Sequence, residues 1–109
     1  MQLYPEMAAA MQADDVDRYV ALLDEHFAYF RHKSGDALDR TQMAGLLRQV
    51  WRPGNRTIDS IRCLYENEDI LVVHMRLSFQ SGSRESAMIV HTKKHGKVVR
   101  IESGVSDLT

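Results

Sequence analysis

The stretch that decides the fold is residues 70–80, which read ILVVHMRLSFQ. Its apolar residues occupy alternate positions, namely Leu71, Val73, Met75, Leu77 and Phe79. Because successive side chains of a strand point to opposite faces, this period of two predicts a strand with one apolar and one polar face. The polar face includes His74 and Arg76.

Turn signals bound this strand and its neighbours. Residues 80–83 (Gln-Ser-Gly-Ser) and 95–96 (His-Gly) predict hairpin turns, and residues 67–69 (Asn-Glu-Asp) predict the turn before residue 70. The other strands are expected at residues 58–65, 84–91 and 98–105. Everything after Pro53-Gly54 is therefore expected to form one antiparallel meander.

The residues before Pro53-Gly54 read mainly as helix. After Pro5, which suits a first helical position, Met7 and Met11 form an i, i+4 apolar pair. Two further segments have apolar residues at i, i+3, i+4 and i+7. They are Val16, Tyr19, Val20 and Leu23, and then Met43, Leu46, Leu47 and Val50. This spacing predicts helices that each have one apolar face.

One strand interrupts the helices. The aromatic run at residues 27–32 (Phe-Ala-Tyr-Phe-Arg-His) predicts a strand that turns at residues 33–36. Asp39 then stands three residues before Gln42, a pair typical of a helix N-terminus.

Helices with one apolar face need a surface to cover, and the meander supplies it. We expect an α+β fold, with three N-terminal helices packed on a strongly curved antiparallel or mixed sheet, and one domain over residues 1–109. The inward sheet face is expected to carry Met75, Phe79, Ser86, Met88 and Ser103. The outer face is expected to carry His74, Arg76, Glu85, His91, Arg100 and Glu102, interleaved with Val72, Ile89 and Val98.

The composition is that of an ordinary globular protein, with 44% hydrophobic and 27% charged residues. The net charge of −1, with both signs interspersed, provides no basic face for nucleic acid. No apolar run approaches a membrane span and no signal segment is visible, so we expect a soluble cytoplasmic protein. The single cysteine, Cys63, excludes an internal disulfide and is expected to be a buried thiol.

Four segments carry a likeness to a known family. They are Ala8-x-x-x-Gln-Ala-Asp-Asp-Val-Asp17, Phe27 to Gly35 (FAYFRHKSG), Asp39 to Leu47 (DRTQMAGLL) and Lys93 to Ile101 (KKHGKVVRI). Together they resemble the nuclear transport factor 2-like superfamily, and within it the small bacterial SnoaL-like and ketosteroid-isomerase-like domains. The resemblance implies a cystatin-like cone with a pocket between the helices and a concave sheet, often in a homodimer formed through the convex face.

The superfamily contains isomerases, polyketide cyclases, epoxide hydrolases, dehydratases and binding modules, so the fold does not choose an activity. Its steroid isomerases use a carboxylate base with a tyrosine and a protonated carboxylic acid. Here the base position falls on Phe30 or Arg31, the acid position on Met88, and the tyrosine position near Met7, with Tyr4 a turn away. Ketosteroid isomerase activity is therefore not expected.

Other catalytic patterns are also missing from the sequence. It contains no H-E-x-x-H, no glycine-rich phosphate loop and no G-x-S-x-G, and the Asp-Arg-Asp set of the epoxide hydrolases has no convincing counterpart. Its five histidines are dispersed. No metal or other cofactor is expected.

The strand at residues 27–32 supplies the sharpest candidates. Tyr29 and Arg31 share one face, which we expect to point inward, and His32 lies on the other. A buried Arg31 would need a carboxylate from the protein or from an acidic ligand; alternatively, it is a rim arginine in solvent or paired with Asp36. Tyr29 and His32 are the candidate acid–base groups.

The remaining expected ligand-binding residues have plainer alternatives. Trp51 could wall the mouth of the cone, although a tryptophan there is also typical of core packing. Met75, Met88 and Phe79 suggest a soft apolar cavity, but at this spacing they also suit a core. The hydroxyls of Ser86 and Ser103 would otherwise bond to neighbouring backbone.

These patterns favour a protein that binds a small apolar or acidic molecule and forms a homodimer through its outer sheet face. No nucleic-acid or membrane partner is expected. One alternative is a SnoaL-like isomerase, cyclase or dehydratase that uses His32 or Tyr29 with Arg31. The other is a protein-interaction module without catalysis.

Overall fold

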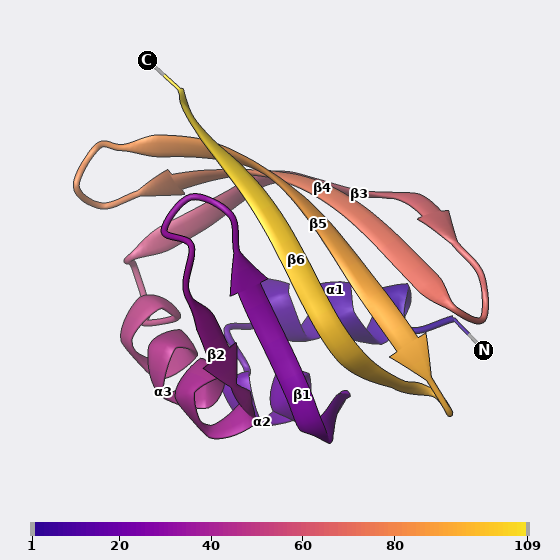
Figure 1. The fold of residues 1–109 in the computed structure, drawn as a ribbon. Coiled ribbons are helices and arrows are strands. Elements are labelled where there is room, and N and C mark those ends of the chain that lie inside the picture. The colour runs from indigo at the N-terminus through magenta and orange to yellow at the C-terminus, as the bar shows by residue number, and fades with distance from the viewer. Residues whose placement is uncertain (1, 109) are drawn as a thin grey trace.

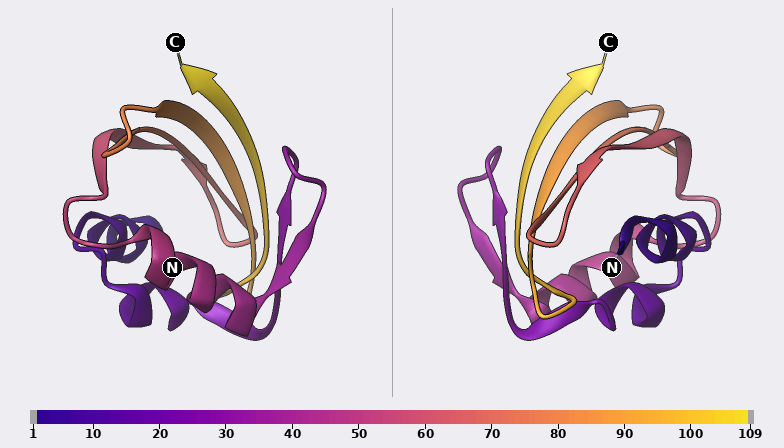
Figure 2. Two further views of the ribbon diagram at one scale, coloured as in Figure 1. Left: turned by 90° about the vertical axis from the view of Figure 1, so that its left-hand side faces the viewer. Right: turned by 90° about the vertical axis from the view of Figure 1, so that its right-hand side faces the viewer.

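The computed structural model describes residues 2–108, which form three helices and six strands (Figure 1). The strands make one sheet in the order β2-β1-β6-β5-β4-β3. Neighbouring strands are antiparallel except β1 and β6, which are parallel, so the sheet is mixed. In Figure 2 the strands bend, and the three helices lie together on the concave side of the sheet. The expected α+β architecture is confirmed.

Two short helices begin the chain, α1 (Tyr4–Gln12) and α2 (Val16–Val20). Asp14 lies between them with φ 52°, a left-handed conformation that aspartate tolerates better than most residues. Asp15 then caps α2, because its carboxylate accepts the backbone N–H of Arg18 at 3.1 Å. This connection turns the chain sharply and leaves the Asp14 side chain beside the sheet.

Helix α3 (Arg40–Val50) begins with the capping pair that the spacing predicted. The Asp39 carboxylate accepts the N–H of Gln42 at 2.8 Å, and the Gln42 side chain accepts the N–H of Asp39 at 2.9 Å. The helix packs against β1 and α2. It ends just before Pro53-Gly54, where Gly54 has φ 77°.

Strand β1 (Leu23–Arg31) begins earlier than predicted, and the short β2 (Ala37–Asp39) was not predicted. The expected helix over residues 16–23 ends at Val20. Its last residues join the sheet instead, since Val98 donates its N–H to the Leu22 carbonyl at 2.9 Å and Leu23 lies opposite Val98. A pairing with a partner 75 positions away has overridden the local helical spacing.

The meander consists of β3 (Arg56–Glu66), β4 (Ile70–Phe79), β5 (Arg84–Lys94) and β6 (Lys97–Leu108). The expected facing of β5 is wrong. Met75 lies opposite Ala87, and residues directly opposite each other in an antiparallel pair share a face. Glu85, Ala87, Ile89 and His91 therefore face the helices, and Ser86 and Met88 face outward.

A register shift between Thr92 and Lys93 changes the facing at the start of β6. Val98, which was expected on the outer face, points into the core and is fully buried. Ile101, which was expected to face inward, is also fully buried. The core lies between the concave sheet face and the helices, and it includes Met7, Tyr19, Phe27, Leu71, Val73 and Ile101.

Cys63, expected to be buried, is exposed on the edge strand β3. Among residues 2–108, no helix has the length and apolarity needed to cross a membrane.

Candidate functional site

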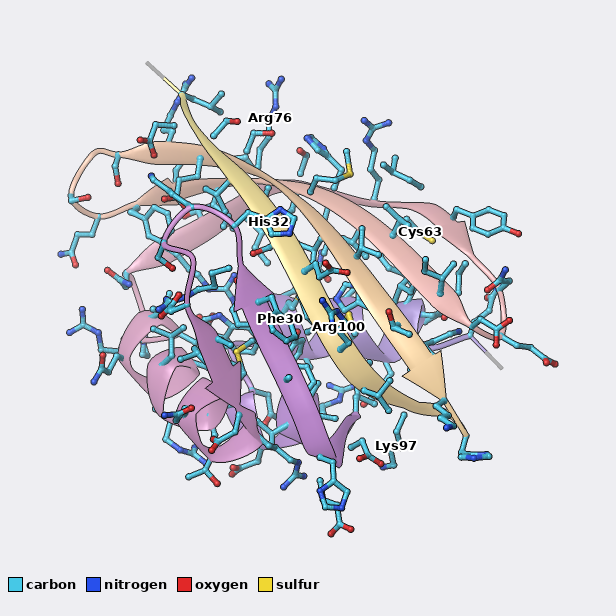
Figure 3. All side chains as sticks on the ribbon, in the orientation of Figure 1. Phe30, His32, Cys63, Arg76, Lys97 and Arg100 are labelled. Carbon is cyan, nitrogen blue, oxygen red and sulfur yellow. The ribbon has the colours of Figure 1, made fainter. Side chains whose placement is uncertain are left out.

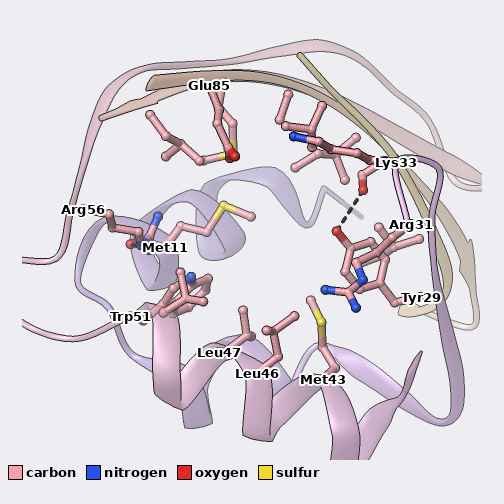
Figure 4. A pocket seen from close by; sticks show the side chains of 18 of the residues that line it. Met11, Tyr29, Arg31, Lys33, Met43, Leu46, Leu47, Trp51, Arg56 and Glu85 are labelled. Atoms are coloured by element: carbon pink, nitrogen blue, oxygen red, sulfur yellow. Dashed lines mark hydrogen bonds between the residues drawn. The ribbon is translucent and has the colours of Figure 1, made fainter. Parts of the chain in front are cut away.

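A cavity of about 430 Å³ lies between the concave sheet face and the helices (Figure 4). This volume is within the range of sites that bind small molecules. All three helices and five strands of the sheet line it, and most of its wall is apolar. The apolar lining includes Met11, Met43, Leu47, Met75, Phe79 and Ile89.

Two hydroxyls form a pair on the cavity wall. Tyr29 Oη and Ser103 Oγ lie 2.8 Å apart, so one of them donates to the other (Figure 4). The adjacent strands β1 and β6 hold them, because Tyr29 lies opposite Ile101 and Arg31 lies opposite Ser103 in the parallel ladder. Each hydroxyl carries one hydrogen, so the pair keeps a second O–H donor beyond its own bond.

Arg31 lines the same cavity and is paired with a carboxylate of the protein. Its Nε donates to Asp36 Oδ1 at 2.9 Å, and its Nη2 pairs with Oδ2 of the same group. Hydrogen bonds from Arg31 and Ser34 hold the pKa of Asp36 well below its usual range. Of the two alternatives for Arg31, the structure contains the rim arginine paired with Asp36.

A second arginine, Arg56, lines the opposite wall at the start of β3 and was not expected at this site. Its Nη2 donates to the Met11 carbonyl at 2.6 Å and contacts Asp14 Oδ1 at 2.8 Å. The guanidinium carbon lies 4.5 Å from the centre of the Trp51 ring. Burial lowers the pKa of Arg56, and the carboxylate of Asp14 opposes that effect.

Trp51 forms part of the wall between the cavity and α2. Its ring meets the ring of Tyr19 edge to face, with 5.1 Å between centroids and 73° between planes. Burial raises the pKa of Tyr19 above its ordinary value. Trp51 is thus both a core residue, as its plainer interpretation held, and a cavity residue.

The cavity wall contains two further charged residues that were not expected there, Lys33 and Glu85. Lys33 is exposed and pairs with Asp107, its Nζ 3.1 Å from both carboxylate oxygens. Glu85 is on the cavity wall because β5 faces inward at odd-numbered positions. The alternation of β5 predicts Glu85 on this wall once the register of the turn before β5 is known.

The expected ligand-binding residues divide into two groups. Tyr29, Arg31, Trp51, Met75, Phe79 and Ser103 line the cavity. Ser86 and Met88 do not, because they lie on the outer face of β5, where Ser86 Oγ is 2.9 Å from His74 Nε2. His32 is exposed, with its Nε2 3.9 Å from Glu102 on the outer face. It therefore lies outside the cavity, and Tyr29 is the candidate acid–base group within it.

The outer sheet face also differs from expectation. His74, Arg76, Arg100 and Glu102 lie on it, and Figure 3 shows Arg100 beside Phe30 on this side. The Arg100 guanidinium carbon is 4.1 Å from the Phe30 ring centre, and Arg100 pairs with Glu102 at 3.4 Å. Glu85 and His91, expected here, face inward instead.

His91 is fully buried and is not among the residues that line the cavity. Its Nδ1 lies 3.0 Å from the Leu71 carbonyl, whereas its Nε2 has no hydrogen-bond partner among residues 2–108. A buried ion pair, Lys93 Nζ to Glu66 Oε2 at 2.7 Å, acts on it electrostatically. Glu66 also accepts the N–H groups of Leu3 and Tyr4, so it anchors the start of α1.

No protein-family model matches the sequence, and no curated protein is similar to it. Solved structures match its fold. A candidate ketosteroid isomerase from Kribbella flavida has a TM-score of 0.82 over 98% of this chain and 77% of its own, at 16% identity. An NTF2-like protein of unknown function from Burkholderia xenovorans has a TM-score of 0.78 over 97% of this chain and 81% of its own, at 18% identity. A candidate polyketide cyclase from Pseudomonas putida has a TM-score of 0.75 over 94% and 87%, at 15% identity.

These likenesses confirm the fold that the sequence segments suggested, the nuclear transport factor 2-like fold. At such low identity they bear on the fold alone, because one fold hosts many activities. The evidence on what this molecule does therefore lies in its own cavity.

Proposed function

We propose that this chain, which has the nuclear transport factor 2-like fold, binds a small molecule in the cavity between its helices and its sheet. The observation that carries the proposal is an apolar cavity of about 430 Å³ with a hydroxyl pair on its wall. Apolar walls with a few placed polar groups are the usual composition of a ligand site. Methionines on three sides, from α1, α3 and β4, adapt to ligands of irregular shape.

The hydroxyl pair offers one polar contact to the proposed ligand. Tyr29 and Ser103 can offer one O–H to a carbonyl or hydroxyl oxygen while keeping their own bond of 2.8 Å. The rest of the ligand would lie against the apolar wall. An uncharged molecule with one oxygen at its end is therefore the simplest probe.

The test uses 1-octanol as that probe. Trp51 is the only tryptophan of the chain and lies on the cavity wall, so its fluorescence reports occupancy, and calorimetry gives the affinity. Ala87→Phe would fill the cavity from β5, because Ala87 is a lining residue. Met88→Phe is the matched control, since the next residue faces outward and is 43% exposed.

We expect 1-octanol to bind wild type and Met88→Phe, and to bind Ala87→Phe much more weakly. Equal affinity for all three proteins, or no binding to any, refutes the proposal. Absence of binding would leave the interaction module without catalysis as the better hypothesis.

The second part of the proposal is a homodimer formed through the outer sheet face. Tyr65 and Met88 support it, because they are large hydrophobic residues exposed at 57% and 43% on strands of this sheet. His74, Arg76, Arg100 and Glu102 would surround them with polar groups, as at many interfaces. Sedimentation of wild type and Met88→Lys tests it, and a monomeric wild type at micromolar concentration refutes it.

Catalysis by an isomerase, cyclase or dehydratase is a second candidate, favoured by the position of Tyr29 in the cavity. Tyr29 would act as the proton donor or oxyanion donor, and Arg31 would contribute its charge from the rim. Tyr29→Phe should abolish turnover of any substrate that a screen identifies. Unchanged turnover in that variant removes Tyr29 from the chemistry.

A further inference from the structure

Arg56 is the most deeply buried cation on the cavity wall. Its side chain is 3% exposed, whereas the side chain of Arg31 on the opposite wall is 32% exposed. Figure 4 shows Arg56 between Met11 and Trp51 at the edge of the cavity. A charge that has lost its water interacts strongly with any anion that reaches it, because little solvent screens the attraction.

The guanidinium of Arg56 keeps a donor that the protein does not use. A guanidinium has five N–H groups, one on Nε and two on each terminal nitrogen. Nη2 donates to the Met11 carbonyl and contacts Asp14. Nε is buried and has no acceptor among residues 2–108. A buried donor is normally satisfied, so this N–H calls for an acceptor.

The pairing of Arg56 with Asp14 differs from that of Arg31 with Asp36 on the opposite wall. The shortest contact between Asp14 and Arg56 is 2.8 Å and reaches Nη2. Arg31 instead uses both Nε and Nη2 on the two oxygens of Asp36. The buried Nε of Arg56 therefore stays open to a second acceptor, whereas the Nε of Arg31 is used by Asp36.

The charges of the cavity wall also favour an anion. Among its lining residues, Arg31, Lys33 and Arg56 are cationic, and Glu85 is anionic. Arg31 and Lys33 are neutralised by Asp36 and Asp107 and lie in contact with solvent. Arg56 is also paired, with Asp14, but it is the one of these three cations whose side chain is desolvated.

We infer that Arg56 is an anion anchor and that the cavity takes small amphipathic carboxylic acids, with the acid group at Arg56 and the apolar body along α3 and β4. The inference rests on the proposed function, since it names the ligand class of the same cavity. A carboxylate oxygen of the ligand can accept the free Nε–H in a charge-assisted hydrogen bond. Trp51, stacked on the guanidinium at 4.5 Å, holds that group in place.

The experiment compares octanoate with 1-octanol, two probes of the same length that differ in charge. Calorimetry and Trp51 fluorescence measure both affinities for wild type, Arg56→Gln, Asp14→Asn and Arg18→Gln. Arg18→Gln is the control, because it removes the same charge from an exposed position on α2 that does not line the cavity. Circular dichroism checks that each variant is folded.

We expect wild type to prefer octanoate, and Arg56→Gln to weaken octanoate by about tenfold or more, the usual effect of losing a charge-assisted hydrogen bond. The affinity for 1-octanol should stay unchanged, and Arg18→Gln should affect neither probe much. Asp14→Asn should tighten octanoate binding, because it removes the carboxylate that competes for Arg56. Asparagine tolerates the left-handed backbone at this position, where φ is 52°.

If Arg56→Gln does not fold, the affinity of Asp14→Asn for octanoate tests the inference. Binding of 1-octanol without a preference for octanoate overturns this inference and leaves the proposed function standing. The same holds if Asp14→Asn binds octanoate no more tightly than wild type. If neither probe binds wild type, the proposed function fails, and this inference fails with it.

Discussion

The buried imidazole of His91 should make the stability of this protein depend on pH between about 6.5 and 4. Nδ1 lies 3.0 Å from the Leu71 carbonyl, so it carries the hydrogen, and Nε2 is the unprotonated nitrogen. Protonation would place a charge and a new N–H at Nε2, which is buried and has no hydrogen-bond partner in the described part of the chain, residues 2–108. Burial is the main reason why the pKa of His91 is lowered from 6.5 to about 4.

The magnitude follows from that difference in pKa. In the unfolded chain the imidazole takes up a proton near pH 6.5, whereas in the folded protein it does so only near pH 4. Unfolded protein therefore binds more protons in this window, and stability falls as the pH falls through it. At about 1.4 kcal/mol per pH unit, the contribution is fully present above pH 6.5, and about 3 kcal/mol is lost by pH 4.

Urea denaturation at pH 7.5, 6.5, 5.5 and 4.5 measures this loss, with His91→Asn as the comparison. Asparagine can keep a donor near the Leu71 carbonyl but does not titrate. The nearby groups Glu66 and Lys93 are common to both proteins, so their effects cancel in the difference. Wild type should lose about 2 to 3 kcal/mol more than His91→Asn between pH 7.5 and 4.5. Equal losses in the two proteins would refute the reasoning.

Three further outcomes follow from named contacts. Lys93→Met should lower the free energy of unfolding by about 3 to 5 kcal/mol, because the Glu66 carboxylate stays buried and loses the ammonium group 2.7 Å away. Urea denaturation measures the loss, and a value below about 1 kcal/mol contradicts this prediction. Asp39→Ala should cost about 1 kcal/mol, since it removes the capping pair of α3, and an unchanged thermal midpoint would show that the cap is not needed. Tyr29→Phe and Ser103→Ala should each cost about 1 kcal/mol and together less than their sum, and a double-mutant cycle without coupling would rule out the 2.8 Å bond between them.

Much of the fold was predictable because local signals and the global arrangement agree. Alternation in residues 70–80 predicted β4, and the turns at residues 80–83 and 95–96 predicted its neighbours in the meander. The start of α3 was predictable for the same reason, since the capping pair lies within four residues. The end of α2 was not, because residues 22 and 23 join β6, a strand 75 positions away.

The candidate site was less predictable than the fold. Tyr29, Met75 and Ser103 were placed on the correct face, but the facing of β5 was reversed, so Ser86 and Met88 were expected in place of Glu85 and Ala87. Because the side-chain period of a strand is two, an error of one residue in the turn before β5 exchanges its two faces. Arg56 was missed for another reason: nothing local in Asn55-Arg56-Thr57 distinguishes a buried arginine from an exposed one.

The sequence by itself determined the α+β architecture, because periods of 2 and 3.6 residues and turn residues act over a few positions along the chain. It also determined that the steroid-isomerase carboxylates are missing, since Met88 and the residues near position 30 cannot replace them. Only the tertiary structure decided which charges face the cavity. That outcome depends on strand register, on a bulge near residue 92, and on the meeting of Asp14, Trp51 and Arg56 from three separate segments. Burial and charge pairing arise from such long-range contacts, and the chemistry of the cavity arises with them.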